Sequence, residues 1–201
     1  MIRNIIFDIG NVLLSFKPDD FLLRFTEDQD LIRFFIQNVI RSKTWLNLDR
    51  GSISIESARN DFLEQFPEKK SMINLFFDDW TDILIPIQQN VQIVKDLKDN
   101  GYDCYFLSNF IEEAYTIVIK KFDFFTFFNG GIISSLVKAI KPEIKIYSCL
   151  LRKYKLNPKE CLFINDVISF LRPARRLGFT TIHYTPKSDL RQELNNLGII
   201  I

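Results

Sequence analysis

Polar side chains able to do chemistry stand at four places in this chain, three of them directly after a short apolar run and one at the head of a predicted helix. They are Asp8, Ser108-Asn109, Asn165-Asp166 and Lys141. A carboxylate such as Asp8 can attack phosphorus and form an aspartyl phosphate, which divides a hydrolysis into two easier displacements. Because that attack brings one anion to another, the site needs positive charge, which a lysine and a divalent cation can supply.

Mg²⁺ is the cation that suits this set of residues, because it prefers oxygen ligands and binds few protein carboxylates. We expect Asp8 and Asp166 to hold it together with a backbone carbonyl and waters. Lys141 would neutralise phosphoryl oxygens, while the Ser108 hydroxyl and the amides after Asp8 would donate directional hydrogen bonds. Asn109 is expected to orient either the substrate or Asp8.

Each of these residues, taken alone, also fits an ordinary structural role. Ser108-Asn109 fits a helix cap, Lys141 a solvated charge and Asp166 a turn residue. The functional interpretation therefore depends on the chain bringing them together. His183 is the only histidine, and its charge could change near neutral pH. It follows a strand far from the other segments in sequence, so a structural role is favoured.

Short apolar runs that alternate with helical patterns predict a parallel sheet. The strand candidates are residues 3–7, 102–107, 161–164 and 180–184. Strands that alternate with helices of this length indicate right-handed crossovers. The carboxyl ends of parallel strands share one edge of the sheet, and ligands bind in the crevice there. The four polar segments should therefore converge at that edge.

The stretch between the first two strand candidates has a different pattern. From about residue 18 to 80 apolar residues recur at helical spacing, and no strand is predicted. We therefore predict an α/β protein with a Rossmann-like doubly wound parallel sheet in residues 1–14 and 86–201, and an inserted helical cap in residues 15–85. Trp45, within the cap, faces either the substrate pocket or the core of the cap.

Size and composition set outer limits. The chain has 201 residues, 47% of them hydrophobic, which suffices for one substantial core and a smaller satellite domain. A formal charge of +1 leaves no broad basic field, so we expect no nucleic-acid partner. Neither a signal-peptide pattern nor an apolar run of bilayer-spanning length is present, so we expect a cytoplasmic protein without a membrane partner. Oligomeric state stays open.

In this order along the chain, the polar segments resemble the motifs of the haloacid dehalogenase-like hydrolase superfamily, and the resemblance spans essentially the whole chain. The segments that carry it are Phe7-Asp8-Ile9-Gly10-Asn11-Val12-Leu13, Leu107-Ser108-Asn109, Lys141-Pro142-Glu143 and Phe163-Ile164-Asn165-Asp166. The segment Leu48-Asp49-Arg50-Gly51-Ser52-Ile53-Ser54 is similar to a cap segment of the sugar-phosphate phosphatase branch, which includes bacterial alpha-glucose-1-phosphatases.

The resemblance implies a Mg²⁺-dependent phosphatase that acts on a small phosphorylated metabolite, such as a sugar phosphate. The residues that it implies for phosphate binding are Ile9, Gly10, Ser108, Asn109 and Lys141. It implies Asp8 and Lys141 as the catalytic pair. It also implies that Mg²⁺ is bound by Asp8, by Asp166 and by the carbonyl of the residue two after the nucleophile, here Gly10.

Three positions depart from the family pattern. Gly10 lacks the carboxylate of a second aspartate that, in many family phosphatases, protonates the leaving oxygen and later activates water. Such general acid catalysis contributes about 100- to 10,000-fold, so we expect slow turnover or a substitute from the cap or solvent. Asn165 replaces an aspartate that is common in this branch, and Phe170 replaces an Asn or Asp that helps to hold the metal's waters. Fewer carboxylates predict weaker Mg²⁺ binding.

Three functions follow from these observations. The leading one is the phosphatase. A second is a catalytically weak or inactive relative that binds a phosphorylated ligand or a protein partner, as the three departures together suggest. The third is a 2-haloacid dehalogenase, which also uses an aspartate nucleophile without the second aspartate. Such an enzyme works without metal, whereas Asp166 and Lys141 suit a metal site.

Overall fold

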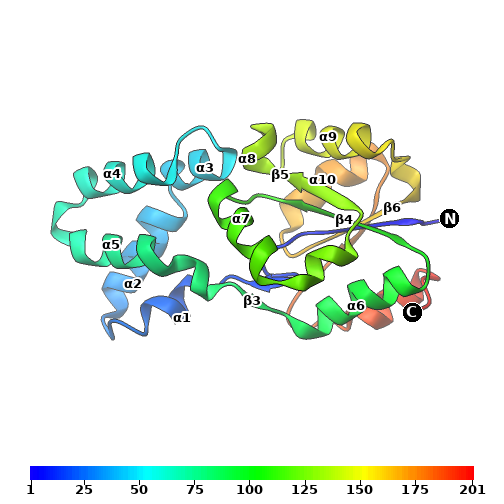
Figure 1. Ribbon diagram of the computed structural model, residues 1–201, viewed down its shortest axis with the longest axis horizontal. Coiled ribbons are helices and arrows are strands. Elements are labelled where there is room, and N and C mark those ends of the chain that lie inside the picture. The colour runs from blue at the N-terminus through cyan, green and yellow to red at the C-terminus, as the bar shows by residue number, and fades with distance from the viewer.

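The computed structural model describes residues 1–201, and its centre is a five-stranded parallel sheet (Figure 1). The strand order is β5-β4-β1-β6-β7. The bounds of these strands are Asn4–Phe7 (β1), Asp103–Ser108 (β4), Gly130–Ile133 (β5), Cys161–Asn165 (β6) and Thr180–His183 (β7). Because β1 lies between β4 and β6, the residues that follow these three strands meet at one edge. The predicted Rossmann-like α/β fold class is confirmed.

Helices cover both faces of the sheet, which explains why its strands are apolar on both sides. Alternate strand residues such as Ile6 and Phe163 pack on one face against α9 and α10, while Ile5 and Phe7 pack on the other against α6, α7 and α11. The helical segments of this half are α6 (Gln88–Asp99), α7 (Glu112–Lys121), η4 (Asp123–Phe127), α8 (Ser134–Val137), α9 (Ile144–Tyr154), η5 (Pro158–Glu160), α10 (Ile168–Leu177) and α11 (Leu190–Asn196). None of the helices in the chain combines the length and apolar character that crossing a bilayer requires.

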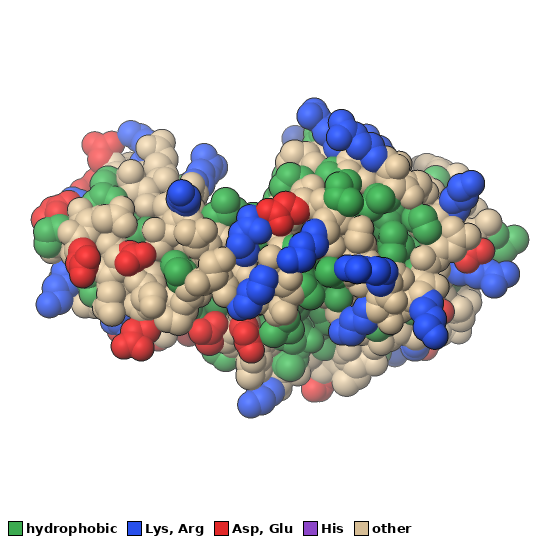
Figure 2. Space-filling model, turned by 90° about the horizontal axis from the view of Figure 1, so that it is seen from above, with side chains coloured by type: hydrophobic (Ala, Val, Ile, Leu, Met, Phe, Trp, Pro, Cys, Tyr) green, Lys and Arg blue, Asp and Glu red, His purple; other side chains and the backbone are tan.

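A second group of helices, which we call the helical unit (residues 18–83), lies beside the sheet. Its segments are α1 (Pro18–Leu22), α2 (Gln29–Phe35), the π-helix η1 (Ile36–Ile40), α3 (Lys43–Arg50), α4 (Ile55–Gln65), η2 (Pro67–Lys69), α5 (Lys70–Asp79) and η3 (Trp80–Ile83). Two short antiparallel strands, β2 (Leu14–Ser15) and β3 (Ile85–Pro86), connect it to the sheet half. Figure 2 shows the two halves as lobes with a narrower region between them.

Local signals explain where the helix nearest the sheet half begins and ends. The Ser42 hydroxyl accepts a hydrogen bond from the Trp45 N–H at the start of α3. The helix ends at Gly51, whose φ of +72° lies in the left-handed region. A Cβ on Gly51 would lie 2.5 Å from the carbonyl oxygen of Ser135 in α8, so a glycine permits the close approach of α3 to α8. The Ser54 hydroxyl then caps the start of α4, where it accepts a hydrogen bond from the Ser57 N–H.

One hydrophobic core of 39 buried residues runs from one face of the sheet into the helical unit. Aromatic rings dominate its part in the helical unit. Phe76 is fully buried, and its ring centroid lies 5.7 Å from that of Phe21, 4.8 Å from that of Phe35 and 5.9 Å from that of Trp45. Because the two halves share this core, we expect them to unfold together.

Replacing Phe76 tests the shared core. Phe76→Ala should lower the free energy of unfolding by about 3–5 kcal/mol, because it removes a fully buried ring and leaves a cavity. Leu136→Ala is the control, since Leu136 is 52% exposed, and should change that energy by no more than about 0.5 kcal/mol. Urea unfolding is followed by far-UV circular dichroism and by the fluorescence of the two tryptophans, which both lie in the helical unit. Separate transitions in the two signals would contradict a shared core.

Candidate active site

A cavity of about 290 Å³ lies between the carboxyl edge of the sheet and the helical unit. Residues singled out from the sequence line its sheet side, namely Asp8, Gly10, Ser108, Asn109, Lys141 and Asp166. Its other side is formed by Phe16, Trp45, Leu46, Asp49, Trp80 and Leu84. Each of the segments selected for their chemistry therefore contributes at least one side chain to this one cavity. Ile9 is the one expected phosphate-binding residue outside the lining of this cavity.

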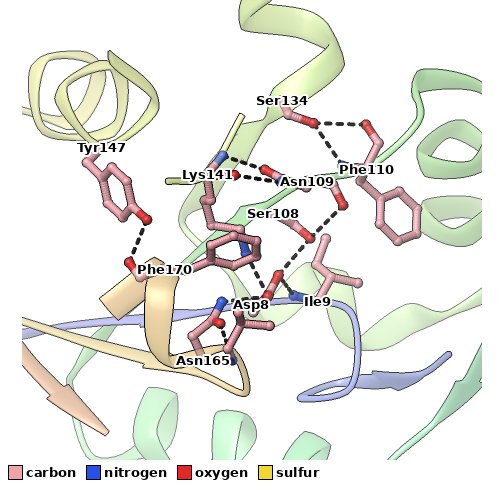
Figure 3. Close-up of polar contacts among 11 residues, drawn as sticks. Asp8, Ile9, Ser108, Asn109, Phe110, Ser134, Lys141, Tyr147, Asn165 and Phe170 are labelled. Carbon is pink, nitrogen blue, oxygen red and sulfur yellow. Dashed lines mark hydrogen bonds and ion pairs between the residues drawn. The ribbon is translucent and has the colours of Figure 1, made fainter. Parts of the chain in front are cut away.

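Asp8, directly after β1, has both carboxylate oxygens engaged (Figure 3). Oδ1 accepts hydrogen bonds from the Ile9 N–H and from the Ser108 hydroxyl, each at 2.8 Å. Oδ2 accepts a hydrogen bond from the Asn165 amide at 2.6 Å and lies 2.6 Å from Lys141 Nζ. A carboxylate offers about four acceptor positions, so all of them are used. These four donors fix the orientation of a side chain that is only 8% exposed.

Asn109 fixes the backbone of Lys141 on the sheet side of the cavity, next to Asp8. The Asn109 amide donates to the Lys141 carbonyl at 3.1 Å, and Asn109 Oδ1 accepts a hydrogen bond from the Lys141 N–H at 2.7 Å. The sequence left open whether Asn109 orients the substrate or Asp8. In the structure its side chain is paired with Lys141 instead, so it positions the lysine that contacts Asp8.

The Lys141 ammonium is buried with few partners. Lys141 is 2% exposed, and Nζ has no hydrogen-bond acceptor besides its ion-pair partner Asp8. The ring of Phe170 flanks the ammonium at 5.2 Å from Nζ to the ring centroid. Burial lowers the pKa of Lys141 below its ordinary value, although the carboxylates of Asp8, Asp166 and Asp49 oppose that change. The N–H groups that do not face Asp8 are therefore free to bind an anion.

Asn165 and Asp166 follow β6 and face different partners. Asn165 is completely buried, and besides donating to Asp8 it accepts a hydrogen bond from the Val167 N–H at 2.7 Å. Asp166 lines the cavity, and burial, together with the negative charge of Asp8, raises its pKa. The carbonyl oxygen of Asp166 lies 2.9 Å from Nε2 of His183. The single histidine thus supports the loop that carries Asp166.

The donor set at this edge fits Mg²⁺ in its chemistry. Two carboxylates, Asp8 and Asp166, and the backbone of Gly10 border one cavity, and Mg²⁺ prefers oxygen ligands with only one or two carboxylates. No group of three or more His, Cys, Asp or Glu side chains is placed to hold a metal, so water would complete the coordination. Because Lys141 and Asn165 share Asp8 Oδ2, a cation at this oxygen requires one of them to move away.

The last turn of α3 is attached to the sheet half close to Lys141. The three contacts, which we call the α3 clasp, are Ser134 Oγ to the Asp49 carbonyl at 2.5 Å, Lys138 Nζ to the Gly51 carbonyl at 2.5 Å, and the Arg50 guanidinium to Glu143 at 2.5 and 2.9 Å. The Ser134 hydroxyl also accepts a hydrogen bond from the Phe110 N–H at 2.9 Å, which ties the clasp to the loop after β4. The helical unit is thereby held against the cavity at a defined position.

Asp49 is the one polar side chain on the wall that the helical unit presents to the cavity. Its carboxylate makes no hydrogen bond and no ion pair, and it touches the cavity while protein surrounds most of it. Burial raises the pKa of Asp49 to about 7, with Lys141 lowering it and Asp8 raising it further. Sequence reasoning missed its position. The signal that exists is its spacing of four residues from Trp45, which places both on one face of α3.

Trp45 illustrates how one side chain serves both surfaces of the helical unit. It is 7% exposed and packs among the aromatic rings of the core, and it also lines the cavity. The two interpretations that the sequence left open therefore both hold. Other cavity residues that the sequence did not single out for binding include Asn11, Phe16 and Trp80. They lie on loops or at helix ends, where no residue pattern indicates a direction.

This arrangement agrees with the sequence family of the chain. The sequence model described as haloacid dehalogenase-like hydrolase matches residues 31–184, which is more than half of the chain. The chain belongs to this family of hydrolases.

Relatives and solved structures extend the comparison over nearly the whole length. A sesquiterpene phosphatase of Aspergillus oryzae is 23% identical over 192 residues, which cover 96% of this chain and 94% of the relative. A haloacid dehalogenase family enzyme of Bacteroides thetaiotaomicron, solved with magnesium and inorganic phosphate, gives a TM-score of 0.75 at 20% identity over 96% of this chain and 99% of its own. The L-2-haloacid dehalogenase of Xanthobacter autotrophicus gives 0.71 at 16% identity over 100% and 85%. The two structures share the fold of this chain.

Asn165→Asp tests how the Asp8 carboxylate is supported. An aspartate keeps an acceptor for Val167 but removes the donor to Asp8 and places a second negative charge beside it. In EDTA the variant should be less stable by about 1–3 kcal/mol, the cost of a buried polar group that loses its partner. Mg²⁺ should restore more stability to the variant than to the unmodified protein, because added negative charge strengthens cation binding.

The matched control is Asn157→Asp. It makes the same change of charge at an exposed residue whose side-chain oxygen caps η5, a role that an aspartate also fills. Thermal unfolding with EDTA and with Mg²⁺ measures both variants. Equal stability of Asn165→Asp and the unmodified protein in EDTA would mean that Asn165 does not support Asp8 as described.

Proposed function

We propose that this chain is a Mg²⁺-dependent phosphatase that hydrolyses a small phosphorylated metabolite through an aspartyl phosphate on Asp8. The main support for this proposal is that four side chains line one cavity at the carboxyl edge of the sheet, namely Asp8, Ser108, Lys141 and Asp166. Membership of the hydrolase family supports it. The full-length similarity to a sesquiterpene phosphatase supports it as well.

In the proposed reaction the residues of the chain have separate tasks. A carboxylate oxygen of Asp8 forms a bond to phosphorus while the bond from phosphorus to the organic oxygen breaks. The Lys141 ammonium, which has no other acceptor, binds the phosphoryl oxygens, and the Ser108 hydroxyl turns from Asp8 to the phosphoryl group. Water then attacks phosphorus, and the Asp8 carboxylate leaves as inorganic phosphate is released. Bound by Asp8, Asp166 and Gly10, Mg²⁺ would offset the repulsion between the two anions.

The cap predicted for residues 15–85, which contains the helical unit, closes over the substrate in this proposal and selects its organic part. Its cavity wall is apolar, with Trp45 and Trp80 as its largest side chains and Asp49 as its single polar one. The several hydroxyls of a sugar need several hydrogen-bond partners, whereas this wall offers Asp49 as its one polar side chain. We therefore propose a phosphate monoester with an apolar organic part. The name of the Aspergillus oryzae relative, a sesquiterpene phosphatase, points in the same direction.

A second candidate is a protein that binds a phosphate ester without hydrolysing it. Two observations favour it, namely the missing carboxylate at Gly10 and the four donors that occupy every acceptor position of Asp8. It predicts binding of a phosphate ester with no release of phosphate. The experiment on Asp8 separates the two candidates.

Asp8→Asn should abolish hydrolysis, because an amide of the same shape is not a nucleophile. We expect kcat to fall at least about 1,000-fold, the scale on which loss of a catalytic nucleophile acts. The assay measures release of inorganic phosphate from farnesyl phosphate with Mg²⁺ and with EDTA. Asp28→Asn is the matched control, since Asp28 caps α2 at the surface and an asparagine caps equally well.

Two results would go against this assignment. If Asp8→Asn hydrolysed the ester as fast as the unmodified protein, Asp8 would not be the nucleophile. Saturable binding of the ester by the unmodified protein, without any release of phosphate, would establish the second candidate instead.

The apolar wall makes a separate prediction about substrate choice. The value of kcat/KM for farnesyl phosphate should exceed that for glucose 1-phosphate by at least about 100-fold, since buried hydroxyls without partners cost several kcal/mol. Trp80→Ala should reduce this ratio, because it removes an apolar surface that only the isoprenoid uses. A preference for the sugar phosphate in the unmodified protein would show that the apolar wall does not select the substrate.

A further inference from the structure

On the basis of the proposed phosphatase reaction, we propose that Asp49 of the helical unit is the general acid and base of this site, in place of the carboxylate that Gly10 lacks. The inference names a catalytic residue that lies on the side of the cavity opposite Asp8 and deepens the proposed function. It rests on the direction of the reaction, on the contacts that hold α3 and on the surroundings of the carboxylate.

The direction of the reaction points to the wall formed by the helical unit. In phosphoryl transfer the attacking and leaving oxygens lie roughly in line, on opposite sides of phosphorus. Asp8 attacks from the sheet edge, so the leaving oxygen lies on the side of the helical unit. A departing alkoxide needs a proton, and Asp49 is the only side chain on that wall with an exchangeable carboxyl proton.

The α3 clasp holds Asp49 in place through its backbone and leaves its side chain free. Ser134 Oγ donates to the Asp49 carbonyl, and the adjacent residues Arg50 and Gly51 bind the sheet half as well. The carboxylate makes no hydrogen bond or ion pair of its own. A carboxylate that is fixed by its backbone and unpaired at its side chain is available for proton transfer to a bound substrate.

The charges around Asp49 come from both sides of it. Asp8, Lys141 and Asp166 face the cavity from the sheet half, while Arg41 and Lys43 border a shallow depression next to Asp49 on the helical unit. Burial raises the pKa of Asp49 to about 7, with Lys141 opposing the shift and Asp8 adding to it. Near neutral pH the group therefore exists in both the protonated form that an acid needs and the ionised form that a base needs.

The proton balance closes over the two steps. In the first, protonated Asp49 gives its proton to the leaving oxygen as the bond from phosphorus to that oxygen breaks, and the alcohol departs. In the second, ionised Asp49 takes a proton from water as the water oxygen bonds to phosphorus and the Asp8 carboxylate is released. Asp49 ends protonated, as it began, and one water is consumed for each ester.

Two substrates with different leaving groups test this role in Asp49→Asn. Farnesyl phosphate releases an alkoxide that needs a proton, so kcat should fall by about 100- to 10,000-fold. Dinitrophenyl phosphate releases a stable phenolate, so the first equivalent should appear at the rate of the unmodified protein. Later turnovers should be slow, because water has lost its base. Asp61→Asn, at an exposed acid of α4, is the matched control and should behave like the unmodified protein.

Thermal unfolding of Asp49→Asn tests the raised pKa and also establishes that the variant folds. The pKa of Asp49 is raised on folding, so its ionisation in the folded state costs stability as pH rises from about 4 to 7. Asp49→Asn should therefore unfold at a higher temperature than the unmodified protein at pH 8, with little difference at pH 4. If the difference in unfolding temperature between Asp49→Asn and the unmodified protein were the same at pH 4 and pH 8, the pKa of Asp49 would not be raised and its role as acid and base would lose its basis.

The failure of this inference differs from the failure of the proposed function. If Asp49→Asn hydrolyses farnesyl phosphate at the unmodified rate and with the same pH profile, the acid and base role is wrong while the phosphatase stands. If the unmodified protein hydrolyses neither ester, the proposed function fails and the inference fails with it. An initial burst of phenolate in Asp49→Asn that is absent in Asp8→Asn supports both.

Discussion

The ion pair between Asp8 and Lys141 is the interaction on which the rest of the structure depends. Both side chains are almost completely buried, and their charged atoms lie 2.6 Å apart. Moving two charges out of water costs several kcal/mol for each ion, and only good geometry with further hydrogen bonds offsets that cost. The neighbouring strands provide those bonds, since Ser108 at the end of β4 and Asn165 at the end of β6 donate to Asp8. Asn109 fixes the backbone of the lysine. The parallel order of the strands thus places the hydrogen-bond donors that offset the cost of burying this ion pair.

The helical unit keeps this pair away from water and, by doing so, changes the chemistry of its own residues. A core shared with the sheet and the α3 clasp hold the unit against the cavity. The same loss of solvent that makes the ion pair costly raises the pKa of Asp49 to about 7. A site that lacks a carboxylate at Gly10 therefore has one with suitable acidity on the opposite wall. The loss of water between the two halves thus determines both the energetic cost of the Asp8–Lys141 ion pair and the acidity of Asp49 on which its proposed role depends.

The sequence predicts the parts of the site that the sheet itself positions. The sequence shows Asp8, Ser108 and Asp166 at the ends of apolar strands, and because parallel strands end at one edge of a sheet, these residues are expected to meet.

The strand β5 is not predicted from the sequence, because Gly130-Gly131 interrupts its apolar run. Only the structure shows that the Phe106 ring fills the space that a Cβ on Gly131 would need. The partner of Asn109 and the role of Asp49 depend on loop paths and on how two halves meet. From the sequence, Asn165 is only a missing carboxylate, whereas the structure shows it as a hydrogen-bond donor to Asp8.

The central claim, that the buried carboxylate of Asp8 is the group that accepts phosphorus, is tested most directly by mass spectrometry after rapid acid quenching. The protein is mixed with farnesyl phosphate and Mg²⁺, stopped within the first turnover and digested. We expect a phosphoryl group on the peptide that contains Asp8, formed before inorganic phosphate appears and lost as it is released. Release of phosphate at the full rate with an unmodified Asp8 peptide throughout, or with the phosphoryl group on another residue, would contradict it.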